Sequence, residues 1–471
     1  MEKKFLPVAK IPPNWDAIIF VISLLYFFLK VIFLATHVSP TIPPDELTHI
    51  QLGLLHHDTW QLTLPDSIDT YHLGPVSRFP TLYGWILGRL YNLNLFLLSP
   101  ILFFRLLNVL LGLITVIFAW KMFRLLTSNK FVSALGIVVL TNIPMFTFLC
   151  AAISYDNLAN LFAIMAFYHL FKFLNDYQCR DFWLVVIVTL AGCLTKHSFL
   201  PLGFILGAIL LWDFSKSHRR ILKTLWPTGC SFEKIFLTLL IGLLLFLNIR
   251  LYGINFYKFH KPIPSCHQVL TVEQCARGEN FRTYHTLWEQ AKKIPEDQFL
   301  KPSLYFYHWA IMIEKGILGI FGYKIIFKSF EELLLYNILL LPALFSFIRY
   351  YRFKEKTIDY CLFAIIFYAA VLFWFVNYKT YRMTAHPLAG LQGRYLFPVL
   401  APSVFVFCYF LINNFRGIAR VGLMVAVSLT FIWGDLPYFL GHVNDTWYLP
   451  KANDFSTFNA AGGTDKSSPI P

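Results

Sequence analysis

Apolar segments of membrane-spanning length recur along the chain, and they restrict its fold more than any other feature. Many of them carry 18 or more predominantly apolar residues, close to what a helix needs to cross the hydrocarbon core of a bilayer. The chain is 57% hydrophobic and only 14% charged, whereas soluble domains average about 25% charged residues. The sequence therefore predicts an all-α polytopic membrane protein.

The apolar segments predict eleven transmembrane helices. The shorter segments are close to the lower limit of about 17 residues for a crossing, and only the stretch TKHSF at 195–199 separates the fifth segment from the sixth. The predicted spans are residues 16–36, 100–120, 131–151, 155–173, 182–196, 198–212, 235–252, 331–349, 358–376, 395–413 and 419–440.

Short basic connections predict the orientation of these spans. Lys and Arg cluster before the first span and after each even-numbered one, and the positive-inside rule places such connections in the cytoplasm. This distribution explains the net charge of +14 without nucleic acid as a partner. We expect no cleavable signal peptide, because the first span is too long for one and no cleavage site follows it.

The predicted topology gives one transmembrane domain, residues 1–440, with two large outer segments at 37–99 and 253–330. Within the first outer segment, residues 44–57 and 79–98 are expected to form interfacial helices. The C-terminal tail, 441–471, is expected to be extracytoplasmic and largely disordered, because it is polar and ends in Gly, Ser and Pro.

The outer stretch PPDELTHI, residues 43–50, carries the first candidate site residues. Asp45 and Glu46 are adjacent acids at the start of a predicted helix, and His49 follows one turn later. Paired acids at a membrane surface can act as a general base or hold a divalent metal. The alternative is that one of them caps the helix. We assign Asp45 as the catalytic base, with Glu46 and His49 in support.

Further charges lie at the outer ends of later spans. Asp156, in SYDNLAN, begins the fourth span, where an acid marks either a site or a helix cap. Lys196 and His197, in TKHSFLP, follow the fifth span. A lysine there departs from the positive-inside pattern, which favours binding of an anionic ligand such as phosphate; the alternative is that it snorkels to the surface.

The predicted outer loop YKTYRMTAHPLAGLQGRYLFP supplies the remaining candidates. Arg394 follows a glycine at the start of the tenth span, an arrangement that lets backbone and guanidinium approach an anion together. Tyr395, Arg382 and His386 are assigned with it to substrate binding. Acids and phosphate-binding cations on one side of a membrane suit a transfer reaction in which a carboxylate activates the acceptor and cations neutralise a departing phosphate.

The eight cysteines carry no metal-binding spacing. Six of them resemble scattered small hydrophobic residues. Cys266 and Cys275 share a polar outer loop, so they form either a disulfide or two free thiols. Nucleotide-binding and zinc-protease motifs do not occur, and an extracytoplasmic site has no nucleotide sugars, so the expected donor is lipid-linked.

The order of the motifs PPDELTH, SYDNLAN, TKHSFLPL, ILGIFGYK and QGRYLFP resembles a bacterial and archaeal family of polytopic membrane proteins of largely unassigned function. More broadly, the acidic first outer loop and the spans that follow resemble the GT-C superfamily of membrane glycosyltransferases. The resemblance covers about residues 15–440. It implies inverting transfer of a sugar from a polyprenyl-phosphate carrier, with Asp45 as the base and Glu46 beside it.

The sequence thus predicts a glycosyltransferase of the bacterial inner membrane, with a polyprenyl-phosphate-linked donor and a glycan, lipid or protein acceptor. No cofactor is assigned, although the paired acids could hold a divalent metal. A transporter or flippase of lipid-linked glycans is the alternative, and Lys30 inside the first span is the observation that favours it. A non-catalytic scaffold is the third option, and it would not require charges at several outer span ends.

Overall fold

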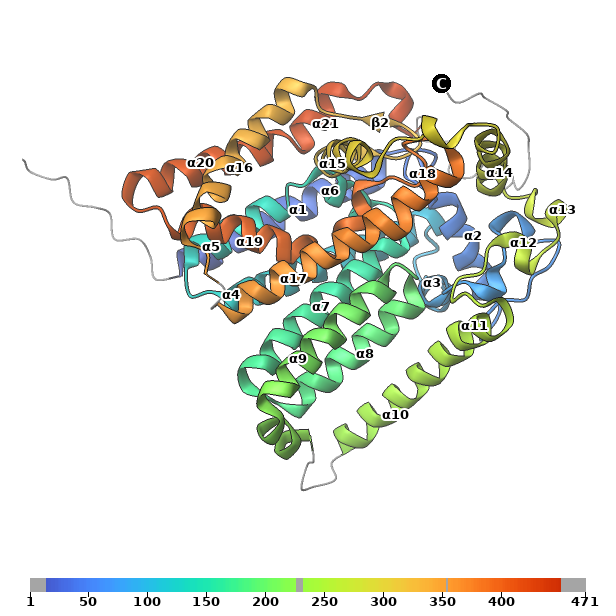
Figure 1. Cartoon of the computed structure of the whole chain (residues 1–471), viewed down its shortest axis with the longest axis horizontal. Coiled ribbons are helices and arrows are strands. Elements are labelled where there is room, and N and C mark those ends of the chain that lie inside the picture. The colour runs from blue at the N-terminus through green and yellow to red at the C-terminus, as the bar shows by residue number, and fades with distance from the viewer. Residues whose placement is uncertain (1–13, 226–231, 353–354, 450–471) are drawn as a thin grey trace, which may run out of the picture.

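The computed structural model describes residues 14–225, 232–352 and 355–449, and it is a helical bundle (Figure 1). Several of its helices begin with a side-chain cap. Ser99 precedes Pro100 and its hydroxyl accepts a hydrogen bond from the Leu102 amide, and Ser329 forms a capping box with Glu332. The bundle helices are α1 (Trp15–His37), α4 (Pro100–Leu126), α5 (Lys130–Leu140), α6 (Pro144–Ala151), α7 (Tyr155–Asp176), α8 (Cys179–Thr195), α9 (Phe199–Leu225), α10 (Phe232–Asn248), α16 (Phe330–Tyr350), α17 (Lys356–Val371), α19 (Leu400–Asn413), α20 (Gly417–Trp433) and α21 (Leu436–His442).

Shorter elements gather at one end of the bundle, which we call the site end (Figure 1). The first connecting segment forms α2 (Glu46–His57), η1 (Tyr71–Leu73), η2 (Val76–Arg78) and α3 (Leu82–Tyr91). The second forms η3 (Ile249–Gly253), α11 (Ile254–Phe259), α12 (Cys266–Val269), α13 (Val272–Cys275), α14 (Glu279–Ala291), η4 (Glu296–Gln298) and α15 (Pro302–Leu318). The remaining elements are an antiparallel hairpin, β1 (Ile320–Phe321) and β2 (Ile325–Ile326), then η5 (Leu372–Tyr378), α18 (Lys379–Thr384), η6 (Gly393–Val399) and η7 (Asp445–Trp447).

The all-α polytopic architecture is confirmed, but the count of eleven spans is not. Within the described residues, nine helical segments are long and apolar enough to cross a membrane, or ten if one bent pair counts as a single span. That pair is α5 and α6, which are bent by 60° relative to each other. The bend lies just before Pro144, the first residue of α6. The expected fifth span corresponds to α8, which at 17 residues falls short of this length.

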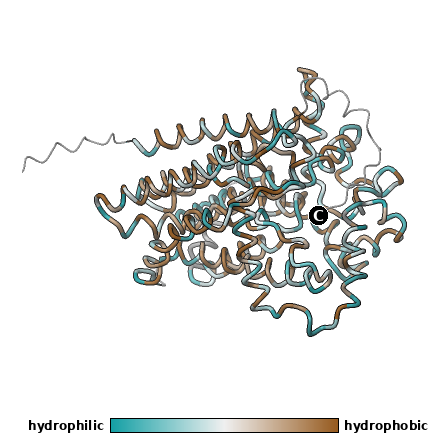
Figure 2. The backbone as a smooth tube through the Cα atoms, turned by 90° about the horizontal axis from the view of Figure 1, so that it is seen from above, coloured by the Kyte–Doolittle hydropathy of each residue, from teal (hydrophilic) through white to brown (hydrophobic). Residues whose placement is uncertain are grey.

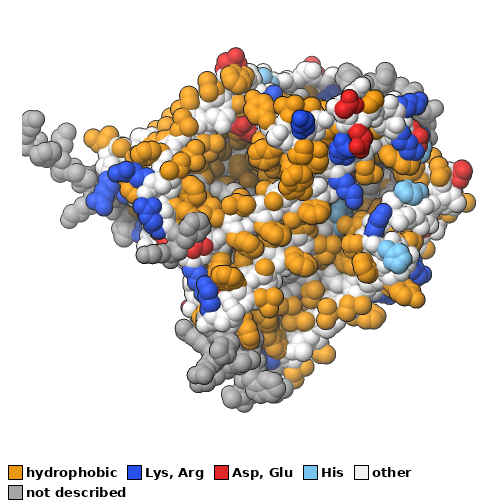
Figure 3. Space-filling view, viewed as in Figure 1, with side chains coloured by type: hydrophobic (Ala, Val, Ile, Leu, Met, Phe, Trp, Pro, Cys, Tyr) orange, Lys and Arg blue, Asp and Glu red, His pale blue; other side chains and the backbone are white. Residues whose placement is uncertain are grey.

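The surface and core of the bundle agree with a lipid environment. Orange apolar side chains cover the middle of the face in Figure 3, and many of the Lys and Arg residues lie toward its ends. Seen from above in Figure 2, the long helices are largely hydrophobic, and many hydrophilic residues lie in the connecting segments. The largest buried cluster is built mainly from α1, α4–α7, α9, α16, α17 and α19. The chain is therefore an integral membrane protein.

A buried ion pair connects the first span to the last. The ammonium of Lys30 in α1 donates to the Asp435 carboxylate between α20 and α21, and to the Thr141 carbonyl at 2.7 Å and Asn142 Oδ1 at 2.8 Å. Thr147 Oγ1 also donates to Asp435, at 3.1 Å. The Lys30 ammonium therefore has a hydrogen-bond acceptor for each of its three protons. This pairing fits a structural role, in which the lysine joins helices that are distant in the sequence.

The segments at the site end close on one another by hydrogen bonds and a disulfide. Cys266 and Cys275 are joined, with a Cα–Cα distance of 6.0 Å. The chain just before residue 450 returns to the end of α1, where the Ser39 amide donates to the Trp447 carbonyl at 2.9 Å. The tail that was expected to be largely disordered, 441–471, is described as far as residue 449, where it contains the end of α21 and η7; residues 450–471 lie outside the described residues. Cys230 lies outside them too.

Two glycines let α15 and η6 cross backbone to backbone. A Cβ on Gly393 would stand 2.4 Å from the Gly316 carbonyl carbon and 2.6 Å from the Ile317 amide nitrogen. Such contacts cannot be relieved by turning a side chain, because the opposing atoms belong to the backbone. The Gly393 of QGRY thus lies against α15, and this contact sets the position of the arginine that follows.

Replacing Gly393 by alanine is expected to lower the free energy of unfolding by about 1–3 kcal/mol, the usual cost of overpacking a buried contact. Gly242→Ala is the matched control, since a Cβ on Gly242 in α10 meets nothing within 4 Å. Thermal unfolding of both variants in one detergent checks this. Equal unfolding temperatures would contradict the backbone crossing.

Candidate functional site

Four of the predicted site residues form an alternating row of charges at the site end, which we call the charge chain. Its members are Asp45, Arg394, Asp156 and Lys196. Arg394 Nη2 lies 3.1 Å from Asp45 Oδ2, and its Nη1 lies 3.6 Å from Asp156 Oδ2. The Lys196 ammonium pairs with the other oxygen of Asp156. The charge chain connects four segments that are far apart in the sequence: the first loop, α7, the end of α8, and η6.

A turn and a hairpin hold Asp45 in place. Asp45 has φ +60°, a left-handed backbone conformation that a non-glycine residue seldom adopts. The Tyr323 amide, in the turn between β1 and β2, donates to the Ile42 carbonyl at 2.9 Å. The Tyr323 hydroxyl lies 3.4 Å from Asp45 Oδ1. Although Asp45 precedes α2, its side chain makes no capping bond, so its carboxylate is directed to these partners.

At the start of α7, one residue caps the helix and a different residue carries the charge. The Ser154 hydroxyl accepts from the Asp156 amide at 3.2 Å and so caps the helix. The Asp156 carboxylate is therefore left to pair with Lys196 and Arg394, in the first turn, where the helix dipole also favours an anion. Next to it, the amide of Asn157 donates to Asn108 and to two backbone carbonyls, which fixes the bend between α6 and α7.

Lys196 is enclosed rather than extended to the surface. It follows the last residue of α8, and its ammonium lies 4.7 Å from the ring centre of Tyr155 and 4.9 Å from that of Tyr395. Its side chain is only 6% exposed. Burial lowers the pKa of Lys196, and the charge of Asp156 opposes this change. The lysine is thus held between two aromatic rings and one carboxylate.

A cavity of about 530 Å³ lies against this end of the charge chain. Lys196 and Tyr395 are on its wall, together with the neighbouring His197, which is exposed. Tyr284 of α14 is there too, and the negative charge of Asp45 adds to the rise that burial causes in the pKa of Tyr284. The rest of the wall is mostly apolar and comes mainly from α9, α17, η5 and α18: Leu200, Pro201, Val371, Leu372, Phe375, Val376, Thr380, Met383 and Thr384.

The two adjacent acids of the first loop have different surroundings. Glu46 is fully buried and receives two hydrogen bonds from Arg105 of α4, at 2.8 and 2.7 Å, and one from the Ile153 amide at 2.9 Å. Arg105 also donates to the Ala35 and Val38 carbonyls at the end of α1. Glu46 therefore joins α2 to α4, to the end of α1 and to the segment before α7. The carboxylates of Asp45 and Glu46 have different partners and do not face the same ion position.

His49 lies beside the charge chain but not in it. Its ring meets those of Tyr155 and Tyr83 edge-on, with centroids 4.4 and 5.8 Å away. Its Nδ1 has no hydrogen-bond partner among the described residues. Burial lowers the pKa of His49 to about 4, although the charge of Asp45 works against this change. The imidazole is therefore neutral at pH 7.

Two predicted residues are not brought to the charge chain. Arg382 Nη2 lies 2.8 Å from Glu296 Oε1, and its guanidinium covers the ring of Phe299. His386 is exposed in the loop that follows α18. Within the part of the chain that the structure describes, no three His, Cys, Asp or Glu residues are placed to hold a metal ion.

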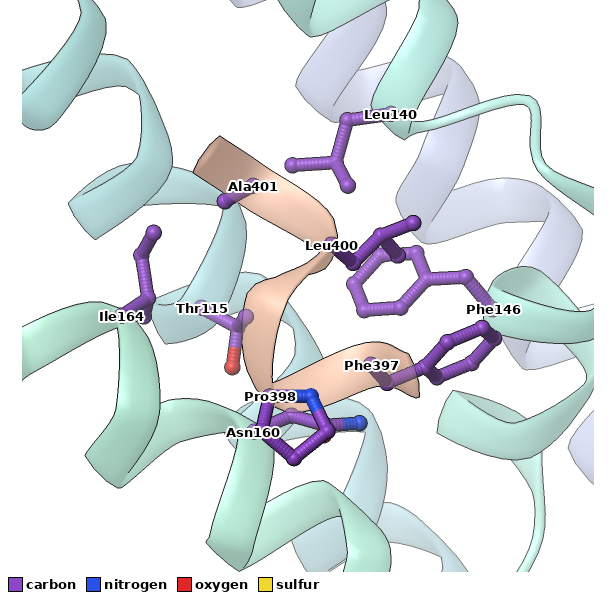
Figure 4. A pocket seen from close by; sticks show the side chains of 9 residues that line it. All are labelled: Thr115, Leu140, Phe146, Asn160, Ile164, Phe397, Pro398, Leu400 and Ala401. Atoms are coloured by element: carbon purple, nitrogen blue, oxygen red, sulfur yellow. The ribbon is translucent and has the colours of Figure 1, made fainter. Parts of the chain in front are cut away.

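A second, much smaller cavity lies beside η6. Figure 4 shows Thr115 and Asn160 facing it across Pro398, where η6 passes into α19. Its volume of about 20 Å³ has room for about one water molecule. The Asn160 Nδ2 group lacks a partner among the described residues, so a water there has at least one polar group to bind.

Sequence reasoning missed Arg105, Tyr323 and Tyr284. Arg105 had a visible signal, because an arginine six residues into an apolar span calls for a partner. Tyr323 lies in the ILGIFGYK motif, but nothing there pointed to the tyrosine itself, and Tyr284 had no signal, since tyrosine is frequent in this chain, with 24 residues. Only the fold brings Tyr323 of the β1–β2 turn and Tyr284 of α14 to Asp45.

Glu46→Gln is expected to destabilise the protein by about 3–5 kcal/mol, because it leaves Arg105 charged and buried without its counter-ion. The double variant Glu46→Gln/Arg105→Gln is expected to lose less, since it removes both charges. Unfolding of the variants in detergent measures this difference, with Glu273→Gln on the exposed α13 as control. A double variant less stable than Glu46→Gln alone would overturn the pairing.

Comparison with known proteins gives one match in sequence and further matches in structure. Residues 80–249, less than half of the chain, match the family model described as dolichyl-phosphate-mannose-protein mannosyltransferase. No curated protein sequence matches the chain.

The chain is similar in structure to ArnT from Cupriavidus metallidurans bound to undecaprenyl phosphate, with 12% identity and a TM-score of 0.48, over 88% of this chain and 63% of the other. It thus spans less than two thirds of that ArnT chain. The apo state of the same ArnT aligns with 11% identity and a TM-score of 0.38, over 85% and 78% of the two chains. The family-model match confirms the predicted resemblance to the GT-C membrane glycosyltransferases.

Proposed function

We propose that the protein is a membrane glycosyltransferase that moves a sugar from a polyprenyl-phosphate donor to an acceptor hydroxyl. The description of the matched family names a sugar donor linked to dolichyl phosphate. Dolichyl phosphate is a lipid of the polyprenyl-phosphate class. The observation that carries the proposal is the cavity beside Lys196. It joins a cation and tyrosine hydroxyls at one end to an extended apolar wall, as a phosphate carried on a polyprenyl chain requires.

The apolar wall of this cavity continues to the outside of the bundle. Phe375 is 72% exposed, and Val376 and Met383 are 41% and 49% exposed. Apolar side chains so exposed on a membrane helix face lipid. A polyprenyl chain can therefore reach the cavity from the bilayer along η5 and α18 and leave its phosphate at Lys196, where the cavity becomes polar.

Lys196 is the cation that we assign to the phosphate. It lies on the cavity wall, whereas Arg394 does not and is only 2% exposed in its side chain. Lys196 stabilises the negative charge that develops on the phosphate as it departs. Arg394 acts through other residues, because it holds the carboxylates of Asp45 and Asp156 in their places.

Asp45 is the base in this proposal. Its side chain is 30% exposed, whereas those of Asp156, Lys196 and Arg394 are 6% exposed or less. An incoming acceptor can therefore reach Asp45. Asp45 takes the proton of the acceptor hydroxyl, and the oxygen attacks the anomeric carbon opposite the phosphate. The new C–O bond forms as the bond to phosphate breaks, and the phosphate leaves with the electron pair, so the configuration inverts.

Glu46 and His49 support this site from behind. Glu46 fixes the start of α2, and thereby Asp45, through Arg105. The neutral ring of His49 fills the space between Tyr155 and Tyr83. Glu46 and His49, predicted from the sequence to support the base, are thus positioning residues. Arg382 and His386, which lie away from the charge chain, are proposed to contact the acceptor.

The site is proposed to face the extracytoplasmic side of a bacterial inner membrane, with the N-terminus in the cytoplasm. The basic short connections support this orientation. The disulfide between Cys266 and Cys275 at the site end fits an oxidising compartment. The alternative, a flippase of lipid-linked glycans, rests on Lys30, and the pairing of Lys30 with Asp435 supplies a structural reason for that charge.

Asp45→Asn is expected to reduce sugar transfer from a polyprenyl-phosphate donor by at least about 100-fold, because general-base catalysis contributes about 10²–10⁴-fold. Asp58→Asn is the matched control, since Asp58 lies in the same loop and its side chain is 87% exposed. Transfer of radiolabelled sugar in proteoliposomes checks both. Full transfer by Asp45→Asn would rule out Asp45 as the base, and no covalent transfer by the wild type would favour the flippase.

Lys196→Gln is expected to lower kcat by about 100-fold, the usual effect of removing one group that stabilises transition-state charge. Because the lysine also contacts the ground-state phosphate, binding of an unreactive polyprenyl phosphate should weaken in parallel. Lys293→Gln, on an exposed loop, is the control in both assays. Unchanged lipid binding and unchanged kcat would place the phosphate elsewhere.

A further inference from the structure

A separate pocket of about 340 Å³ lies at the site end between the first connecting segment and α10. It shares no lining residue with the cavity beside Lys196. The end of α8 stands between the two, with Leu194 on the wall of this pocket and Lys196 on the wall of the other. The remaining wall comes from residues 61–65 and 77–81 of the first connecting segment and from α10, η3 and α11.

Three cations line the pocket: Arg78, Arg250 and Lys258. No acidic residue is on its wall, and none of the three forms an ion pair with another described residue. The Nε group of Arg78 is buried without a hydrogen-bond partner in the described structure. Asp66 of the same loop is engaged elsewhere, since it accepts from the Ser77 amide at 3.1 Å and from the Ser77 hydroxyl. The pocket therefore has uncompensated positive charge.

Apolar and basic residues alternate on this wall along the helix axis. Leu247 comes first, Arg250, Leu251 and Ile254 follow, and Lys258 lies at the outer end. At about 1.5 Å per residue, the distance from Leu247 to Lys258 along the axis is about 16 Å. A π-helical turn, η3, interrupts the helix between them and contains Arg250. Such turns often occur at binding sites because they redirect side chains from the regular spiral.

We propose that this pocket binds the phosphate of an anionic membrane lipid, with its acyl chains along α10. Three unpaired cations in one pocket suit a phosphate group. The apolar side of α10 that precedes Arg250, with Leu247 on the pocket wall and Leu243 exposed, suits acyl chains and would not contribute to binding a free anion. Phe246 and Ile249 beside it are each 59% exposed, so the apolar surface continues down the lipid-facing side of the helix. Binding here does not depend on the proposed transfer reaction.

Lipid binding to the full chain, purified in a non-ionic detergent, tests this proposal. Native mass spectrometry compares dioleoyl phosphatidylglycerol with dioleoyl phosphatidylcholine. The wild type is expected to retain the anionic lipid at least 10-fold better. The double variant Arg250→Gln/Lys258→Gln is expected to lose that preference, and both residues are exposed, so the variant should unfold at the wild-type temperature when no lipid is added.

One further variant locates the effect. Lys261→Gln removes an exposed charge near Lys258 that is not on the pocket wall, and it should keep the full preference. Equal retention of the two lipids by the wild type, or an unchanged preference in Arg250→Gln/Lys258→Gln, would overturn the proposal. So would complete displacement of the lipid by inorganic phosphate at equal concentration, since the apolar wall would then contribute nothing.

Discussion

The pairing of four alternating charges, three of them buried, is the constraint on which the site end depends. A single charge removed from water in a helical bundle is costly, and the cost is offset only by a well-placed counter-ion. Asp156 is placed between Lys196 and Arg394, and Arg394 between Asp156 and Asp45. Each charge therefore needs the segments that carry its neighbours, and a shift of α7, α8 or η6 along the bundle would leave one charge without its partner.

The same constraint depends on close backbone contacts in the neighbouring structure. Arg394 can reach both carboxylates only because Gly393 lies against the Gly316 backbone, which leaves no room for a side chain between η6 and α15. Asp45 can face Arg394 only because its backbone is left-handed and the β1–β2 turn bonds to Ile42. The Glu46–Arg105 pair then fixes α2 from the other side. Backbone contacts thus hold the charges that polar side chains alone would hold less firmly.

Much of this arrangement could be predicted from the sequence, and the remainder has identifiable causes. Charge at an outer span end is visible in one dimension, so Asp45, Asp156, Lys196 and Arg394 were all identified. The separation of Asp45 from Glu46 was not, because it depends on Arg105, which is 59 positions away from Glu46. The count of eleven spans is not confirmed among the described residues, because hydropathy alone does not show the bend before Pro144, and α8, with 17 residues, is shorter than a full span. Pairings between distant segments, and bends inside apolar segments, are properties of packing rather than of local pattern.

The position of α8 between two pockets bears on how such a protein can handle lipids. The cavity at Lys196 contains a cation that Asp156 already neutralises, so it suits a phosphate whose charge increases during a reaction. The pocket at Arg250 contains cations without counter-ions, so it suits a phosphate whose charge does not change. The cavity at Lys196 therefore suits a phosphate that gains charge during a reaction, and the pocket at Arg250 suits a phosphate of constant charge. Leu194 in the last turn of α8 and Lys196 just after it are two residues apart, so one helix end contributes to the walls of both pockets and sets their separation.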